Sequence, residues 1–224
     1  MKAMILAAGR GERMRPLTDR IPKPLLPVCG RALIDYHLEA LACAGFHDVV
    51  INIAYRSRQI VEHCRRHDHG LELHFSDEGP SALETGGGIR HALPLLGGGA
   101  FAVINGDIHT DYPYQRLLQA AREMPLDCLV HLVMVPNPQH RKDGDFALTN
   151  GMLRAEGGSR LTFSGIGLYR PELFDGIPDG AFPLAPLLRQ AMTRGLASGE
   201  RYDGRWCDVG TPERLAELES GLGC

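Results

Sequence analysis

The sequence contains no long apolar run, and no part of it approaches the ~20 consecutive apolar residues of a membrane-spanning helix. The apolar stretch at residues 3–8 is too short for a secretory signal and is followed at once by arginines. Paired cysteine motifs are also missing, because none of the six cysteines forms a C-x-x-C pair; they are Cys29, Cys43, Cys64, Cys128, Cys207 and Cys224. These absences predict a cytoplasmic protein with reduced thiols and exclude a membrane span, a disulfide framework and a zinc knuckle.

The chain has no excess of positive charge. Its 24 lysines and arginines, against 27 aspartates and glutamates, give a formal net charge of −3 at pH 7. Nucleic-acid-binding domains are usually basic, so no nucleic-acid partner is expected. Basic residues gather instead between positions 10 and 23, which favours a small anionic ligand. No H-E-x-x-H zinc motif occurs, and His63 and His67, four residues apart on an expected helix, are interpreted as part of a solvated face.

Two well-known phosphate-binding patterns are missing as well. The sequence has no G-x-x-x-x-G-K-[ST] run, and Met14 stands where a dinucleotide fingerprint has its third glycine. What the N-terminus does contain is an apolar strand at 4–7 that opens into Ala8-Gly9-Arg10-Gly11. A buried strand that ends in a small-residue loop with cations is how an open α/β sheet builds an anion site. An ordinary strand-to-helix turn with solvated arginines is the alternative at this point.

Lys23 favours the anion site over the ordinary turn. It lies between Pro22 and Pro24. Proline fixes its own φ and pushes the preceding residue toward an extended conformation, so the backbone here is stiff and the lysine side chain has a defined direction. A lysine needed only for solubility does not require such a setting.

The order of expected elements defines the fold class. Helices are expected at 33–42, 60–64 and 89–93 and strands at 49–53, 71–75 and 101–105, with a glycine-rich loop at 78–88. Further strands are expected at 128–135 and 161–169, a hairpin about Asn150-Gly151 and helices at 184–192 and after Thr211. This order predicts one α/β domain over 1–224 with a doubly wound, mainly parallel, Rossmann-like sheet and a mixed-sheet extension that carries a substrate pocket.

Two carboxylates are candidate metal ligands. Asp107 follows the buried strand that ends in Asn105-Gly106, where it is well placed to hold Mg²⁺ against phosphates, although an aspartate in a simple turn fits equally well. Asp208, just before Gly210, is the best second carboxylate. The run Glu84-Thr85-Gly86-Gly87-Gly88 has too many glycines for an ordinary helix start, so its backbone could lie against a flat base.

These motifs together resemble the sugar-1-phosphate nucleotidyltransferases over essentially the whole chain. The matching stretches are residues 6–18, Pro22-Lys23-Pro24-Leu25, Asn105-Gly106-Asp107, Phe163-Ser164-Gly165-Ile166 and Trp206-x-Asp208-x-Gly210-Thr211-Pro212. One departure is Glu12, where many members carry a small hydroxyl residue. The resemblance implies a nucleotide-binding half at 1–110 and a sugar-binding half at 111–224, whose small β extension forms the sugar pocket.

The implied reaction joins a nucleoside triphosphate and a sugar 1-phosphate, with Mg²⁺, to give a sugar nucleotide and pyrophosphate. The loop at 83–88 and the strand at 163–165 are most similar to uridylyltransferases that use UTP and N-acetylmuramic acid 1-phosphate in cell-wall recycling. A guanylyltransferase acting on mannose or heptose 1-phosphate is the first alternative, and a non-catalytic nucleotide-sugar-binding regulatory module is the second. A metal-dependent glycosyltransferase is disfavoured, because Asp107 is not part of a D-x-D motif.

The resemblance also implies a role for each matching residue. The catalytic residues would be Arg13, Lys23 and Asp107, and the metal ligands Asp107 and Asp208. The nucleotide would contact Leu6, Ala7, Ala8, Gly9, Gly11, Glu12, Arg13, Lys23, Gly79, Gly86 and Gly87. The sugar would contact Asn105, Gly144, Ser164 and Gly165. The oligomeric state stays open.

Overall fold

A nine-stranded sheet forms the centre of the computed structural model, which describes all 224 residues. Its strands are β1 (Ala3–Leu6), β4 (Asp48–Ile53), β5 (Glu72–Asp77), β6 (Phe101–Asn105), β8 (Val130–Val135), β9 (Phe146–Thr149), β10 (Met152–Arg154), β11 (Arg160–Tyr169) and β12 (Ala197–Arg201). They lie in the order β5-β4-β1-β6-β11-β8-β12-β10-β9. Two small ribbons pair β2 (Pro27–Val28) with β3 (Arg31–Ala32) and β7 (Ile108–Thr110) with β13 (Trp206–Asp208).

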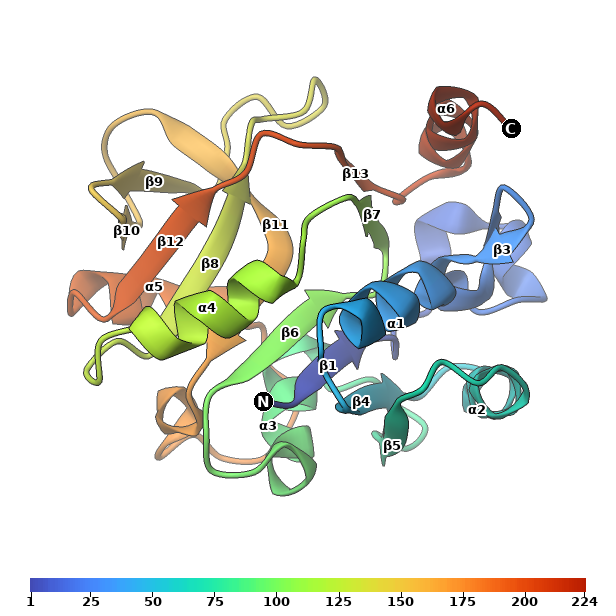
Figure 1. The fold of residues 1–224 in the computed structure, drawn as a ribbon, viewed down its shortest axis with the longest axis horizontal. Helices are drawn as coiled ribbons and strands as arrows, with labels where there is room; N and C mark the ends of the chain where they lie inside the picture. Colours follow the sequence, from blue (N-terminus) through green and yellow to red (C-terminus); the bar gives the residue numbers. More distant parts are fainter.

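The chain forms six α-helices, of which α6 lies away from this sheet, near the two small ribbons (Figure 1). They are α1 (Leu33–Cys43), α2 (Ser57–Arg66), α3 (Glu84–Leu96), α4 (Gln115–Glu123), α5 (Ala185–Thr193) and α6 (Pro212–Leu222). Short 3₁₀ turns occur at Glu12–Met14, Leu17–Asp19, Lys23–Leu25 and Pro171–Phe174. None of the helices is both long enough and apolar enough to cross a membrane.

The direction of the strands changes half-way across the sheet. β5, β4, β1 and β6 are parallel, as the alternation of strands and helices predicts for the first half. β11 then runs antiparallel to both β6 and β8, and β12 runs parallel to β8. The sheet is therefore mixed, and the prediction of mainly parallel strands holds only for its N-terminal half.

The two faces of the sheet bury separate apolar cores. Side chains alternate along β1, so Ile5 packs on one face with α1, α2 and α4, while Met4 packs on the other with α3 and α5. Figure 1 shows α1 and α4 in front of the sheet and α3 behind it. A third, smaller core ties the N-terminal loop to α6 through Met14, Leu26 and Leu215. This third core fixes the loop after β1 against the C-terminal helix.

The glycines at 86–88 belong to the first turns of α3 and not to an open loop, so the expectation of a loop through residue 88 was wrong. The backbone N–H groups of Gly86 and Gly87 donate to the Phe182 carbonyl at 3.0 and 3.1 Å. A Cβ on Gly87 would lie 2.2 Å from the Gly180 carbonyl oxygen. These glycines are required because the segment at 180–182 crosses the helix in direct backbone contact.

Gly87→Ala should therefore destabilise the fold by about 1–3 kcal/mol, because the added methyl group must push aside a backbone carbonyl and not a flexible side chain. Gly98→Ala is the matched control, since no neighbouring atom lies within 4 Å of a Cβ at that position. Urea unfolding measures both effects. Equal stabilities for the two variants would contradict the close packing of α3 on residues 180–182.

One pair of cysteines departs from the prediction of reduced thiols. Cys29 and Cys224 form a disulfide with their Cα atoms 5.5 Å apart, while Cys43, Cys64, Cys128 and Cys207 are free. The pair is separated by 195 residues in the sequence, so no local spacing could reveal it. α6 brings its C-terminal end to β2, where the Cys29 N–H donates to the Glu219 carboxylate at 3.1 Å.

Candidate active site

A cleft of about 510 Å³ lies at the C-terminal ends of β1, β4 and β6. This is the edge at which open α/β sheets bind their ligands. Its lining comes from six parts of the chain. They are residues 6–13, Lys23 and Pro24, Asn52, four residues between 78 and 85 (Glu78, Ala82, Glu84 and Thr85), residues 105–107, and Gly210. Only four of the 19 lining residues are hydrophobic, which suits a highly charged ligand.

The loop after β1 is fixed by Gly11 and Met14. Gly11 has a φ of +64°, and a Cβ there would lie 2.9 Å from Thr18 Cγ2 and 3.1 Å from Lys23 Cβ. The Thr18 hydroxyl donates to the Gly11 carbonyl at 2.9 Å. Met14, which replaces the expected third glycine, is fully buried in the third core and anchors the loop. Gly9 has no neighbouring atom within 4 Å of a Cβ, so its backbone borders open space.

A buried polar chain closes the floor of the cleft. The Ala7 N–H donates to Asn52 Oδ1 at 2.7 Å, and Asn52 Nδ2 donates to Glu78 Oε1 at 2.6 Å. The other Glu78 oxygen accepts the Leu83 N–H at 2.6 Å. The sequence predictions omitted Asn52 and Glu78, although the asparagine stands out as the polar residue in the apolar run of β4. Both hold the start of the loop against β4, because a buried polar group needs its partners.

Lys23 and Asp107 meet inside the cleft. Lys23 Nζ lies 2.7 Å from Asp107 Oδ2, although the two residues are 84 positions apart. The lysine side chain is only 10% exposed, so its ammonium group faces the cleft and not bulk solvent, while the aspartate side chain is 40% exposed. A largely buried cation beside a more accessible carboxylate offers both charges to a ligand that enters the cleft.

Asp208 reaches the same region through the β7–β13 ribbon. It pairs with Ile108, and the Val209 N–H donates to the Asp107 carbonyl at 2.8 Å, so the backbones of the two candidate metal ligands are adjacent. Its carboxylate, however, is held by the Arg214 guanidinium and lies 3.2 Å from His140 Nε2. Asp208 does not line the cleft, whereas Gly210 does.

Of the expected sugar-binding residues, Asn105 lines the cleft, whereas Gly144, Ser164 and Gly165 lie outside its lining. The Ser164 hydroxyl is buried and donates to the Val133 carbonyl at 2.7 Å. Gly165 has a φ of +83°, and a Cβ there would lie 2.6 Å from Asn105 Nδ2, so the Asn105 side chain rests on this glycine. Gly144, with a φ of +61°, packs against the backbone of Arg160.

The structure therefore brings most of the candidate residues together. Those that line the cleft are Leu6, Ala7, Ala8, Gly9, Gly11, Glu12, Arg13, Lys23, Asn105 and Asp107. Those that do not are Gly79, Gly86, Gly87, Gly144, Ser164, Gly165 and Asp208. Lining residues that the sequence predictions did not include are Arg10, Pro24, Asn52, Glu78, Ala82, Glu84, Thr85, Gly106 and Gly210. Glu84 and Thr85 line the cleft in place of the expected Gly86 and Gly87 because α3 begins at residue 84. Gly86 and Gly87 pack instead against the segment at 180–182.

Comparison with known proteins identifies the family of this chain. Residues 2–147 match the family model described as nucleotidyl transferase. The chain is 50% identical to N-acetylmuramate alpha-1-phosphate uridylyltransferase of Neisseria meningitidis over 228 residues, which cover 100% of this chain and 99% of that protein. The chain belongs to the nucleotidyltransferase family. The family that the sequence motifs predict is thereby confirmed.

Two further proteins are similar to this nucleotidyltransferase over nearly its whole length. It is 36% identical to N-acetylmuramate alpha-1-phosphate uridylyltransferase of Caulobacter vibrioides, covering 98% of this chain and 96% of that protein. The crystal structure of HddC from Yersinia pseudotuberculosis in complex with GMP-PN superposes with a TM-score of 0.80 at 21% identity and covers 99% of each chain. The second similarity shows that the Rossmann-like nucleotidyltransferase fold extends over the chain.

Proposed function

We propose that this nucleotidyltransferase joins UTP and N-acetylmuramic acid 1-phosphate to give the UDP-sugar and pyrophosphate. The Lys23–Asp107 pair in a polar cleft is the observation that carries the proposal. Support for the choice of substrates comes from the two full-length relatives, both described as N-acetylmuramate alpha-1-phosphate uridylyltransferases. The proposal also places the protein in the cytoplasm, where nucleoside triphosphates are available.

The reaction is an in-line displacement, in which a sugar-phosphate oxygen attacks the α-phosphorus of UTP and pyrophosphate leaves. Such a transfer needs positioning and charge neutralisation more than covalent catalysis. Arg13 and the backbone N–H groups around Gly9 and Gly11 would bind the leaving pyrophosphate. Lys23 would place its positive charge between the α-phosphate and the incoming sugar phosphate, which brings two anions together in one site.

Asp107 and Asp208 would hold Mg²⁺, which neutralises phosphate charge when it is bound. Carboxylate oxygens suit this hard cation, and Mg²⁺ sites commonly use one or two of them together with substrate phosphates. The residues fit the ion in two respects. The Asp107 carboxylate is partly exposed in the cleft, and the buried Asp208 Oδ1 accepts no hydrogen bond, although His140 lies nearby.

The two halves of the chain would divide the substrates between them. In the proposal, residues 1–110 bind the nucleotide, and the base lies near Leu6, Ala8 and Gly79. Residues 111–224 bind the sugar through the segments that hold Gly144, Ser164 and Gly165. Asn105, which belongs to the first half, also contacts the sugar. β9 pairs with β10 and with the first part of β11, and these strands would form the small extension of the sugar pocket. Since the Ser164 hydroxyl is engaged with the Val133 carbonyl, backbone groups of these glycines would contact the sugar.

A substrate panel tests the proposal directly. Pyrophosphate release would be measured with Mg²⁺, each of UTP, GTP, CTP and ATP, and the 1-phosphates of N-acetylmuramic acid, N-acetylglucosamine, mannose and a heptose. We expect UTP with N-acetylmuramic acid 1-phosphate to exceed every other pair by about tenfold or more in kcat/KM. Faster turnover of GTP with mannose or heptose 1-phosphate would replace the proposal with a guanylyltransferase. Binding without any release would indicate a regulatory module.

A further inference from the structure

Three potential metal ligands gather at the edge of the sheet opposite the cleft. Asp48 and Glu72 begin β4 and β5, and His74 lies two residues further along β5. In the parallel register Asp48 lies beside Glu72, and Val50 lies beside His74. Because side chains alternate along a strand, all three project from the face that also carries Val50. The group thus lies at the N-terminal ends of these strands, whereas the cleft lies at their C-terminal ends.

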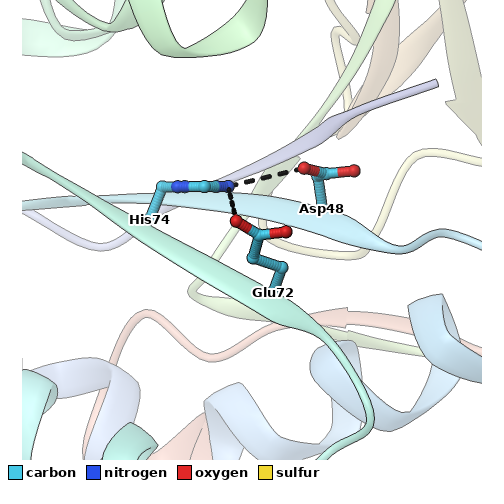
Figure 2. A group of neighbouring side chains, drawn as sticks. All are labelled: Asp48, Glu72 and His74. Carbon is cyan, nitrogen blue, oxygen red and sulfur yellow. Dashed lines mark hydrogen bonds and ion pairs between the residues drawn. The ribbon is translucent and has the colours of Figure 1, made fainter.

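The His74 ring points between the two carboxylates (Figure 2). Its Nε2 atom lies 3.4 Å from Asp48 Oδ1 and 3.5 Å from Glu72 Oε1. One ligand atom from each of the three residues lies within 4.8 Å of the other two. Ligands bound to Zn²⁺ at about 2.0–2.1 Å in a tetrahedral site are roughly 3.3 Å apart, so the two separations from His74 Nε2 match those around a bound ion.

The local charge also favours a cation. Two carboxylates face one imidazole, and the cation that lies nearest to them is Lys2, whose Nζ atom is 3.8 Å from Asp48 Oδ1. Lys2 Nζ also donates to the Leu95 carbonyl at 2.9 Å, at the C-terminal end of α3. The unpaired carbonyl groups of a helix C-terminus carry partial negative charge. A second positive charge is therefore accommodated at this corner of the molecule.

We propose that Asp48, Glu72 and His74 form a binding site for a divalent transition-metal ion such as Zn²⁺, separate from the substrate cleft. One imidazole nitrogen with two carboxylate oxygens suits Zn²⁺, Co²⁺ or Ni²⁺, whereas Mg²⁺ prefers oxygen ligands alone. Three protein ligands leave a further position for water. The ion ties the edge strand β5 to β4, and it has no contact with the substrates.

A simple ion pair between an imidazolium and two carboxylates is the competing explanation, and Lys2 distinguishes the two. In a metal site the Lys2 ammonium repels the ion, so Lys2→Gln should tighten Zn²⁺ binding by about threefold or more. His74→Ala should weaken it at least about tenfold, because it removes the ligand that selects a transition metal. Glu72→Gln, at a side chain that is 72% exposed, should weaken it without disturbing the fold.

Equilibrium dialysis against Zn²⁺ measures these affinities. It would use folded Cys43→Ser protein, because Cys43 is an exposed free thiol, and millimolar Mg²⁺ would be present to occupy the carboxylates of the cleft. The expected result for this protein is one bound Zn²⁺ per chain. Visible absorption of bound Co²⁺ provides an independent readout of the ligand set.

His63 and His67 supply the matched control. His63, expected on a solvated face, in fact contacts both oxygens of Asp35, at 2.9 and 3.0 Å, and its ring lies 4.3 Å from that of His67. His63→Ala with His67→Ala should leave Zn²⁺ affinity unchanged. The proposal is overturned if the Cys43→Ser protein binds no Zn²⁺, if His74→Ala keeps full affinity, or if this double variant loses it. It is also overturned, in favour of the ion pair alone, if Lys2→Gln fails to tighten binding.

Discussion

Replacing Lys23 with alanine should lower turnover by about two orders of magnitude or more while the fold stays intact. The lysine ammonium is held inside the cleft, with 10% of the side chain exposed, so water cannot take over its role in neutralising phosphate charge. Losing one such contact in the transition state costs roughly 3–4 kcal/mol, and each 1.4 kcal/mol is a tenfold change in rate. Pyrophosphate release at saturating UTP and sugar 1-phosphate measures kcat.

The fold of this variant can be checked by circular dichroism and urea unfolding. Lys142→Ala is the matched control, because Lys142 is exposed and does not line the cleft, and its rate should equal that of the unaltered protein. A rate for Lys23→Ala within about fivefold of normal would show that the lysine does not contact the reacting phosphates, since the expected loss follows from electrostatic stabilisation.

Asp107→Asn should reduce turnover by about a hundredfold or more and weaken the dependence of UTP binding on Mg²⁺. The amide keeps the shape and hydrogen-bonding capacity of the carboxylate but lacks the charge that a hard divalent cation requires. The exchange also removes the counter-ion of Lys23, 2.7 Å away. Calorimetric titration with UTP, with and without Mg²⁺, separates loss of the metal from loss of catalysis.

Asp127→Asn, at an exposed aspartate outside the cleft, is the control for the change of charge. Near-normal turnover of Asp107→Asn in Mg²⁺ would show that the metal assignment is wrong. If the variant keeps its Mg²⁺-dependent affinity for UTP but loses turnover, Asp107 positions Lys23 and does not bind the metal.

The residues whose positions the sequence predicts well are those that follow directly on the end of a strand. Gly11 has a positive φ in the loop after β1, and Lys23 lies in the cleft between its two prolines, although it begins a 3₁₀ turn and is not extended as expected. Asp107 follows directly on β6. Because neighbouring parallel strands end at the same edge of a sheet, the order of strands is enough to place the loop after β1 and Asp107 together.

The glycines of α3 show where such inference stops. A run of three glycines is compatible both with a loop that contacts a base and with a helix that contacts another backbone. The helix forms here, and its glycines pack against the segment at 180–182, almost a hundred residues later in the chain. Its Gly180 carbonyl occupies the space that a side chain at Gly87 would need. Similarly, Asn52 and Glu78 join the cleft only because β4 and β5 are neighbours in the sheet.

The sequence by itself determined the α/β class, the small-residue loop after β1 with its cations, and the family. Short motifs determine these because they depend on backbone conformation and residue type over a few neighbouring positions. Only the tertiary structure decided the antiparallel insertion of β11, the pairing of Cys29 with Cys224, the engagement of Asp208 by Arg214, and the group of Asp48, Glu72 and His74. All of these except the Asp208–Arg214 pair join segments that are distant in the chain, and such contacts are determined by the packing and pairing of the whole sheet, which no local pattern records.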